Sequence, residues 1–142
     1  SPAKPARTPA KQPAAGLQRG TETILLVEDE TAVRTLVRSV FERHGYRVIE
    51  AVSGKAALGV WRDHHSEIDL VLTDLIMPDG ITGAMLAEQL RSERPGLKVI
   101  FSSGYSPDSI MQNLPTGPGS RYLQKPYNPQ ILLQAARDCL DE

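Results

Sequence analysis

From Thr23 onward, short apolar runs rich in branched residues alternate with amphipathic stretches of about three helical turns, which is typical of βα units. Residues 24–27 are apolar at every position, and this predicts a strand that is buried on both faces of a parallel sheet. Because βα crossovers are right-handed, repeated units build an open, doubly wound α/β sheet. Sites in such sheets form at the carboxyl ends of the strands, so polar residues there are the first candidates for function.

The pattern predicts five strands and five helices. The strands are expected at 24–27, 47–51, 69–73, 97–102 and 120–124. The helices are expected after Thr31, after Ser53, from about Thr82 to Glu93, near 107–113, and from Asn128 onward. The apolar stripe of the first helix is predicted to comprise Val33, Leu36, Val37, Val40 and Phe41. Thr31, Ser53 and Asn128 are predicted to cap their helices, and Gly45 to end the first helix in a left-handed conformation.

Residues 1–20 lie outside this pattern. They contain four prolines, four cations and no acid, and Leu17 is their only sizeable apolar side chain. A segment of this composition cannot bury a core and is predicted to be a disordered linker, as a tether to an upstream domain would be. An expression-vector remnant is the alternative. Residues 21–142 are predicted to form one domain.

Charge and composition exclude several classes of function. Beyond residue 20 the chain has 12 cations and 17 acids, a net charge of −5, which argues against nucleic acid as a direct partner. No run approaches the roughly 18 apolar residues of a membrane-spanning helix, and the N-terminus lacks the apolar core of a signal peptide. The single cysteine, Cys139, excludes an internal disulfide and fits a reducing compartment. We expect a cytoplasmic domain, whose parent protein could be membrane-anchored.

Three carboxylates follow two of the predicted strands, namely Glu28, Asp29 and Asp74. If the sheet brings them together, they repel one another unless a cation neutralises them. Mg²⁺ prefers oxygen ligands and binds through one or two carboxylates together with phosphate oxygens. Asp29 and Asp74 are candidates for direct ligation, and Glu28 could bind directly or through water.

Ser103 and Lys125 add a hydroxyl and an ammonium at the ends of two more strands, which are expected beside Asp74. A carboxylate that attacks a phosphoryl group requires charge neutralisation on the transferring oxygens, and a metal ion with a lysine supplies it. These groups therefore predict phosphoryl transfer to Asp74. Each has a structural reading when taken alone: the acids at 28–30 favour the positive end of the next helix, and Lys125 could close a turn. Their coincidence at one sheet edge favours a site.

The sequence resembles response-regulator receiver domains over residues 21–142. The matching features are the segments 24–30 (ILLVEDE), 69–78 (DLVLTDLIMP) and 122–126 (YLQKP), together with Gly83 and the pair Ser103 and Gly104. The resemblance implies a flavodoxin-like α/β fold, a five-stranded doubly wound parallel sheet in the order 2-1-3-4-5 with five helices.

The resemblance also implies a role for each candidate residue. Asp74 corresponds to the phosphoacceptor, which receives the phosphoryl group from a phosphohistidine of a histidine kinase or phosphotransfer domain. Glu28 and Asp29 correspond to the acidic pair that binds Mg²⁺, and the backbone carbonyl of Ile76 completes the protein ligands. Lys125 corresponds to the lysine that pairs with the phosphoryl oxygens.

Two further residues correspond to the switch that reports phosphorylation. In the family, the hydroxyl at the position of Ser103 turns toward the phosphoryl group, and the aromatic ring at the position of Tyr122 reorients. The surface formed by segment 104–119, the fifth strand and the last helix is then expected to change and to meet a downstream protein.

The loop 78–83 looks one residue longer than in the commonest receivers, and Gly104 replaces their usual alanine. Both features resemble receivers attached to hybrid histidine kinases. The isolated domain is then not expected to be an enzyme, although its parent chain could be a histidine kinase.

Three alternatives to a hybrid-kinase receiver remain: a single-domain response regulator, a Mg²⁺-dependent phosphatase with an aspartyl nucleophile, and a degenerate receiver that only binds proteins. The phosphatase needs an acid or base two residues after the nucleophile, where Ile76 stands. The complete acidic set argues against the degenerate receiver.

Overall fold

The computed structural model describes residues 20–77, 80–104, 119–125 and 128–141. The predicted linker up to residue 19 and the helix predicted near 107–113 lie outside the described residues. The elements in chain order are β1 (Thr23–Val27), α1 (Thr31–Arg43), β2 (Arg47–Ala51), α2 (Gly54–His64), β3 (Leu70–Asp74), α3 (Gly83–Glu93), β4 (Lys98–Ser103), β5 (Ser120–Gln124) and α5 (Pro129–Leu140). All five predicted strands and four of the five predicted helices are therefore found in the described part of the chain.

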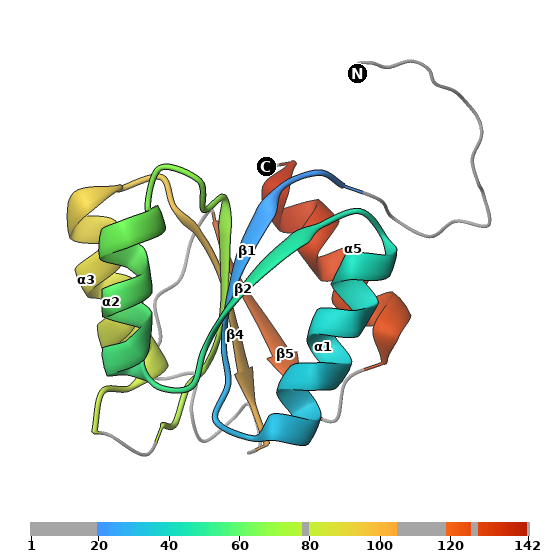
Figure 1. Cartoon of the computed structure of the whole chain (residues 1–142), viewed down its shortest axis with the longest axis horizontal. Coiled ribbons are helices and arrows are strands. Elements are labelled where there is room, and N and C mark those ends of the chain that lie inside the picture. The colour runs from blue at the N-terminus through green and yellow to red at the C-terminus, as the bar shows by residue number, and fades with distance from the viewer. Residues whose placement is uncertain (1–19, 78–79, 105–118, 126–127, 142) are drawn as a thin grey trace.

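The five strands form one parallel sheet in the order β2-β1-β3-β4-β5, which confirms the predicted doubly wound topology. Helices α1 and α5 cover one face of this sheet, and α2 and α3 cover the other (Figure 1). Each helical layer packs on the sheet through its own apolar core. Strands β1 and β3 are buried at every position, because each has a strand on both sides and helices on both faces.

Most of the predicted helix ends are confirmed. The Ser53 hydroxyl accepts a hydrogen bond from the Ala56 N–H at 3.2 Å, and Asn128 caps α5 by accepting from the Gln130 N–H at 2.8 Å. Gly45 follows α1 with φ of +95°, which is the left-handed conformation predicted for it.

The prediction that Thr31 caps α1 is wrong. Thr31 is the first helical residue, Glu30 occupies the cap position, and no side chain caps this helix. The physical reason is the preceding acidic turn: the Glu30 N–H donates to the buried Glu28 carboxylate at 3.0 Å, so Glu28 shapes the turn and the helix begins one residue early.

The apolar stripe of α1 is narrower than predicted. Val37, Val40 and Phe41 are buried, whereas the Leu36 side chain is 49% exposed. Cys139 is buried in the core beneath α5. Within the described residues, no helix is long and apolar enough to cross a membrane.

Candidate functional site

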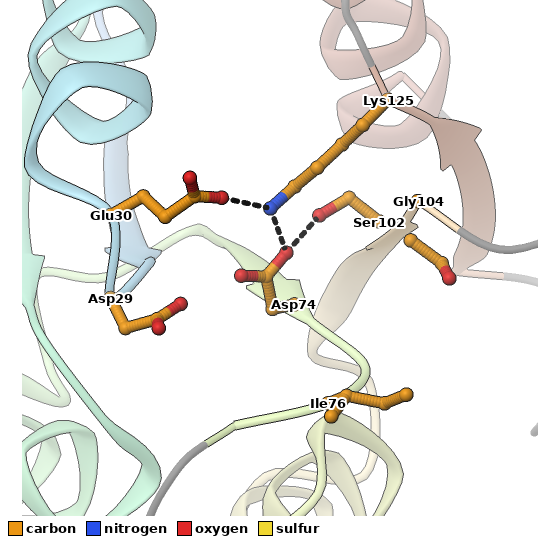
Figure 2. A pocket seen from close by; sticks show the side chains of 8 residues that line it. Asp29, Glu30, Asp74, Ile76, Ser102, Gly104 and Lys125 are labelled. Atoms are coloured by element: carbon orange, nitrogen blue, oxygen red, sulfur yellow. Dashed lines mark hydrogen bonds and ion pairs between the residues drawn. The ribbon is translucent and has the colours of Figure 1, made fainter.

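The candidate residues converge at the edge where the parallel strands end. Glu28 and Asp29 follow β1 directly, Asp74 is the last residue of β3, Ser103 is the last residue of β4, and Lys125 follows β5. A pocket at this edge is lined by Asp29, Glu30, Asp74, Ile76, Ser102, Ser103, Gly104 and Lys125 (Figure 2). The doubly wound sheet therefore brings together the groups that the sequence distributes over about a hundred residues.

The three carboxylates form one cluster. Glu28, Asp29 and Asp74 each offer an oxygen atom within 4.8 Å of the others. Glu28 and Asp74 are buried, at 2% and 5% exposed, while Asp29 is exposed to solvent. Three convergent carboxylate oxygens with one side open to water are a donor set that fits a hard divalent cation. Ile76, whose carbonyl is the remaining predicted ligand, lines the same pocket with its side chain 59% exposed.

The acidity of Glu28 is set by its burial. Burial raises its pKa from 4.5 to about 7, and the neighbouring Asp74 carboxylate acts in the same direction. Hydrogen bonds from Lys125 at 2.8 Å and from the Glu30 N–H at 3.0 Å oppose this shift without cancelling it. Burial therefore disfavours the charged form of Glu28, and a cation bound beside it would favour that form.

Lys125 links the two buried acids. Its ammonium lies 2.7 Å from Asp74 Oδ1 and 2.8 Å from Glu28 Oε1, and 3.9 Å from the exposed Glu30. Although burial favours the neutral amine, the hydrogen bonds to Asp74 and Glu28 raise the pKa of Lys125, so the side chain carries its charge. The backbone N–H of Lys125 donates to the Ser103 carbonyl at 2.9 Å. This hydrogen bond fixes the backbone from which the Lys125 side chain extends into the pocket.

Sequence reasoning missed Ser102. Its buried hydroxyl donates to Asp74 Oδ1 at 3.0 Å, and the β3–β4 register pairs Ser102 with Asp74 directly. The neighbouring Ser103 is half-buried and lines the same pocket. A signal was present in the sequence, because Ser102 is the first polar residue after the apolar run from Val99 to Phe101 and stands directly before Ser103.

Tyr122 lies on β5, where its ring stacks on Phe101 of β4 with centroids 5.3 Å apart and planes 20° apart. The ring is half-buried against the core beneath α2 and α3, and burial raises the pKa of its hydroxyl. This stack connects the last strand to the strand that carries Ser102 and Ser103.

Gly83 opens α3 directly against the backbone of Asp74. A Cβ atom at this position would lie 2.2 Å from the Asp74 carbonyl oxygen, a distance that no real side chain tolerates. The Gly83 N–H donates to the Leu75 carbonyl at 2.8 Å, so the helix start is fastened to the turn after β3. Glycine at 83 is therefore a packing requirement of the site.

Comparison with known proteins agrees with this geometry. Residues 24–137 match the family model of the response regulator receiver domain. The sensor kinase CckA of Brucella abortus is 37% identical over 123 residues, which are 87% of this chain and 13% of that protein. The aerobic respiration control protein ArcA of Escherichia coli K12 is 36% identical over 122 residues, or 84% of this chain and 49% of ArcA. This chain thus spans about half or less of each curated relative.

Among solved structures, the receiver domain of the hybrid histidine kinase CckA superposes with a TM-score of 0.69 at 33% identity. The match covers 83% of this chain and 98% of that domain. The likeness therefore extends over a whole receiver domain.

Proposed function

The chain belongs to the response regulator receiver domain family, and from this premise we propose that Asp74 is the phosphoacceptor through which it takes part in a phosphorelay. Receiver domains of two-component systems take a phosphoryl group from histidine kinases or phosphotransfer proteins, and a protein of this class is the proposed donor. The observation that carries the assignment is the buried Asp74 carboxylate, held 2.7 Å from the Lys125 ammonium inside an acidic pocket.

The proposed transfer is a displacement at phosphorus. An Asp74 oxygen forms a bond to phosphorus while the P–N bond of the donor phosphohistidine breaks, and the imidazole nitrogen keeps the electron pair. With a small acyl phosphate as donor, a P–O bond breaks and the leaving carboxylate takes the pair. Lys125 offsets the negative charge of the phosphoryl oxygens in both reactions, because its charged ammonium already contacts the accepting carboxylate.

Mg²⁺ is the proposed cofactor. Asp29, Asp74 and the Ile76 carbonyl would hold it, and Glu28 would bind directly or through water; their convergence in the pocket supports this set. When bound, the ion would neutralise charge on the transferring phosphoryl group. Ile76 presents an apolar side chain where a phosphatase would need an acid or base, so we propose a phosphoacceptor and not a turnover phosphatase.

We further propose that the parent protein is a hybrid histidine kinase. The similarity to CckA supports this origin. The full-length gene tests it: a histidine kinase encoded in the same reading frame is the expected result, and a receiver encoded alone or with a DNA-binding domain would contradict it.

Phosphorylation itself can be tested with the purified protein and a small acyl phosphate. Intact-mass measurement is expected to find one added phosphoryl group with Mg²⁺ and none with EDTA. Asp74→Asn should abolish the gain because it removes the nucleophile, whereas Asp63→Asn, an exposed acid on α2, should retain it. Undiminished labelling of the Asp74→Asn variant would overturn the assignment.

A further inference from the structure

The two oxygens of the Asp74 carboxylate have different surroundings. Oδ1 accepts hydrogen bonds from both the Ser102 hydroxyl at 3.0 Å and the Lys125 ammonium at 2.7 Å. Figure 2 shows both interactions on this one oxygen, and the second oxygen on the side of Asp29. Oδ2 therefore faces the acidic residues that are proposed to hold Mg²⁺.

Ser102 is fixed where it makes this contact. Its side chain is 2% exposed, and the two residues before it, Ile100 and Phe101, are fully buried. The Ser102 carbonyl accepts the Leu75 N–H at 2.9 Å, which fastens β4 to the backbone that follows Asp74. Since a buried hydroxyl that loses its partner is costly, the Ser102 side chain is held on Oδ1.

We propose that Ser102 is a positioning residue that orients the Asp74 carboxylate, with Oδ2 toward the proposed Mg²⁺ ligands, and that it shortens the lifetime of the acyl phosphate. The inference rests on the proposed function of Asp74. Ser102 and Lys125 together hold Oδ1 from the β4 and β5 sides, which leaves Oδ2 facing Asp29.

The effect on lifetime follows from the charge on Oδ1 during hydrolysis. The water oxygen forms a bond to phosphorus, the bond between phosphorus and the Asp74 carboxylate oxygen breaks, and its electron pair returns to the carboxylate; both water protons leave with the phosphate. A hydrogen bond to a charged carboxylate is stronger than one to an oxygen of the neutral acyl group in the acyl phosphate. The Ser102 hydroxyl therefore stabilises the departing carboxylate more than the phosphorylated state, and this accelerates hydrolysis.

The test compares the decay of phosphorylated wild type, Ser102→Ala and Ser102→Thr. Each protein is labelled with a small acyl phosphate and Mg²⁺, the donor is removed, and the phosphoryl group is followed by intact mass. Ser102→Ala should lose it about fivefold more slowly, as expected for one hydrogen bond. Ser102→Thr retains the hydroxyl and should decay at the wild-type rate, which a loss of packing alone would not predict. Ser92→Ala, an exposed serine on α3, is the matched control.

The outcomes separate this inference from the proposed function. Failure to label wild type would contradict the phosphoacceptor assignment itself. Labelling of every protein with equal or faster decay of Ser102→Ala would overturn only the role of Ser102. If Ser102→Ala does not fold, Ser102→Cys decides the question, because its thiol is a weaker donor. Slower decay of Ser102→Cys supports the inference, and an unchanged rate overturns it.

Discussion

Glu28 is the side chain in which burial and function conflict most directly. Its carboxyl is 2% exposed, so ionisation must take place beside Asp74 inside the protein. In the unfolded chain it titrates near 4.5, whereas in the folded protein the pKa is about 7. Below 4.5 both states are protonated, between the two values only the unfolded state is ionised, and above 7 the folded state bears the full cost.

The metal-free protein should therefore lose stability as the pH rises from 5 to 8. A shift of this size corresponds to about 3 kcal/mol in the free energy of unfolding. Glu28→Gln should lack this pH-dependent loss, apart from a constant offset caused by the weaker pairing of Lys125. Urea unfolding of both proteins in EDTA measures the difference, and parallel pH profiles would contradict the prediction.

At the same scale, the sequence predicted five residues that the structure places in the pocket or in contact with it. It did not predict Ser102. The roles of Glu28, Asp29, Asp74, Ser103 and Lys125 rest on which residue types follow which strands. Ser102 could not be assigned in this way, because its contact depends on the β3–β4 register, which pairs it with Asp74. Register is set by the whole sheet and is not visible in a single strand.

At the scale of elements, α3 is positioned by a close approach to the strand that carries Asp74. Gly83→Ala should lower the free energy of unfolding by about 3 kcal/mol, since the added methyl group would meet backbone that cannot move aside. Gly59→Ala is the matched control: Gly59 lies within α2 with nothing within 4 Å of the added Cβ. It should gain about 0.5–1 kcal/mol from helix propensity. Similar values for the two variants in urea unfolding would contradict the packing argument.

Element ends were predictable where a local motif decides them. Ser53, Asn128 and Gly45 act through contacts within a few residues, so the sequence is sufficient. The predicted cap at Thr31 was wrong because the turn before α1 is shaped by the burial of Glu28, which is a tertiary effect. Leu36 lies on the exposed side of α1, which periodicity alone does not resolve at the margin of an apolar stripe.

At the scale of the whole molecule, the sheet order places β4 and β5 beside the acidic pocket, although both strands lie far from Asp74 along the chain. The doubly wound sheet was predictable because buried parallel strands joined by helices allow few topologies, whereas the strand order was implied by the resemblance to receiver domains. The change on phosphorylation that the resemblance implies should pass through β4 and β5, from Ser103 at the end of β4 to the Tyr122 ring that stacks on Phe101.

Phosphorylation should therefore change the NMR signals of the Tyr122 ring more than those of Trp61, which is buried on α2 and donates to Glu93 at 3.2 Å. Spectra with and without acyl phosphate, in Mg²⁺, compare the two rings in one sample. Ser103→Ala should reduce the Tyr122 response without preventing phosphorylation. Equal changes at Tyr122 and Trp61 would contradict a response directed along β4 and β5.

The central claim, that Asp74 carries the phosphoryl group, is tested most directly by chemical trapping. Borohydride reduces an acyl phosphate to an alcohol, so the modified carboxylate is permanently marked and peptide mass spectrometry locates it. After treatment with a small acyl phosphate and Mg²⁺, the mark should appear at position 74 and should disappear when EDTA replaces Mg²⁺. A mark at Asp29 or Glu28 in place of Asp74, or a phosphorylated protein that borohydride leaves unmarked, would contradict the account.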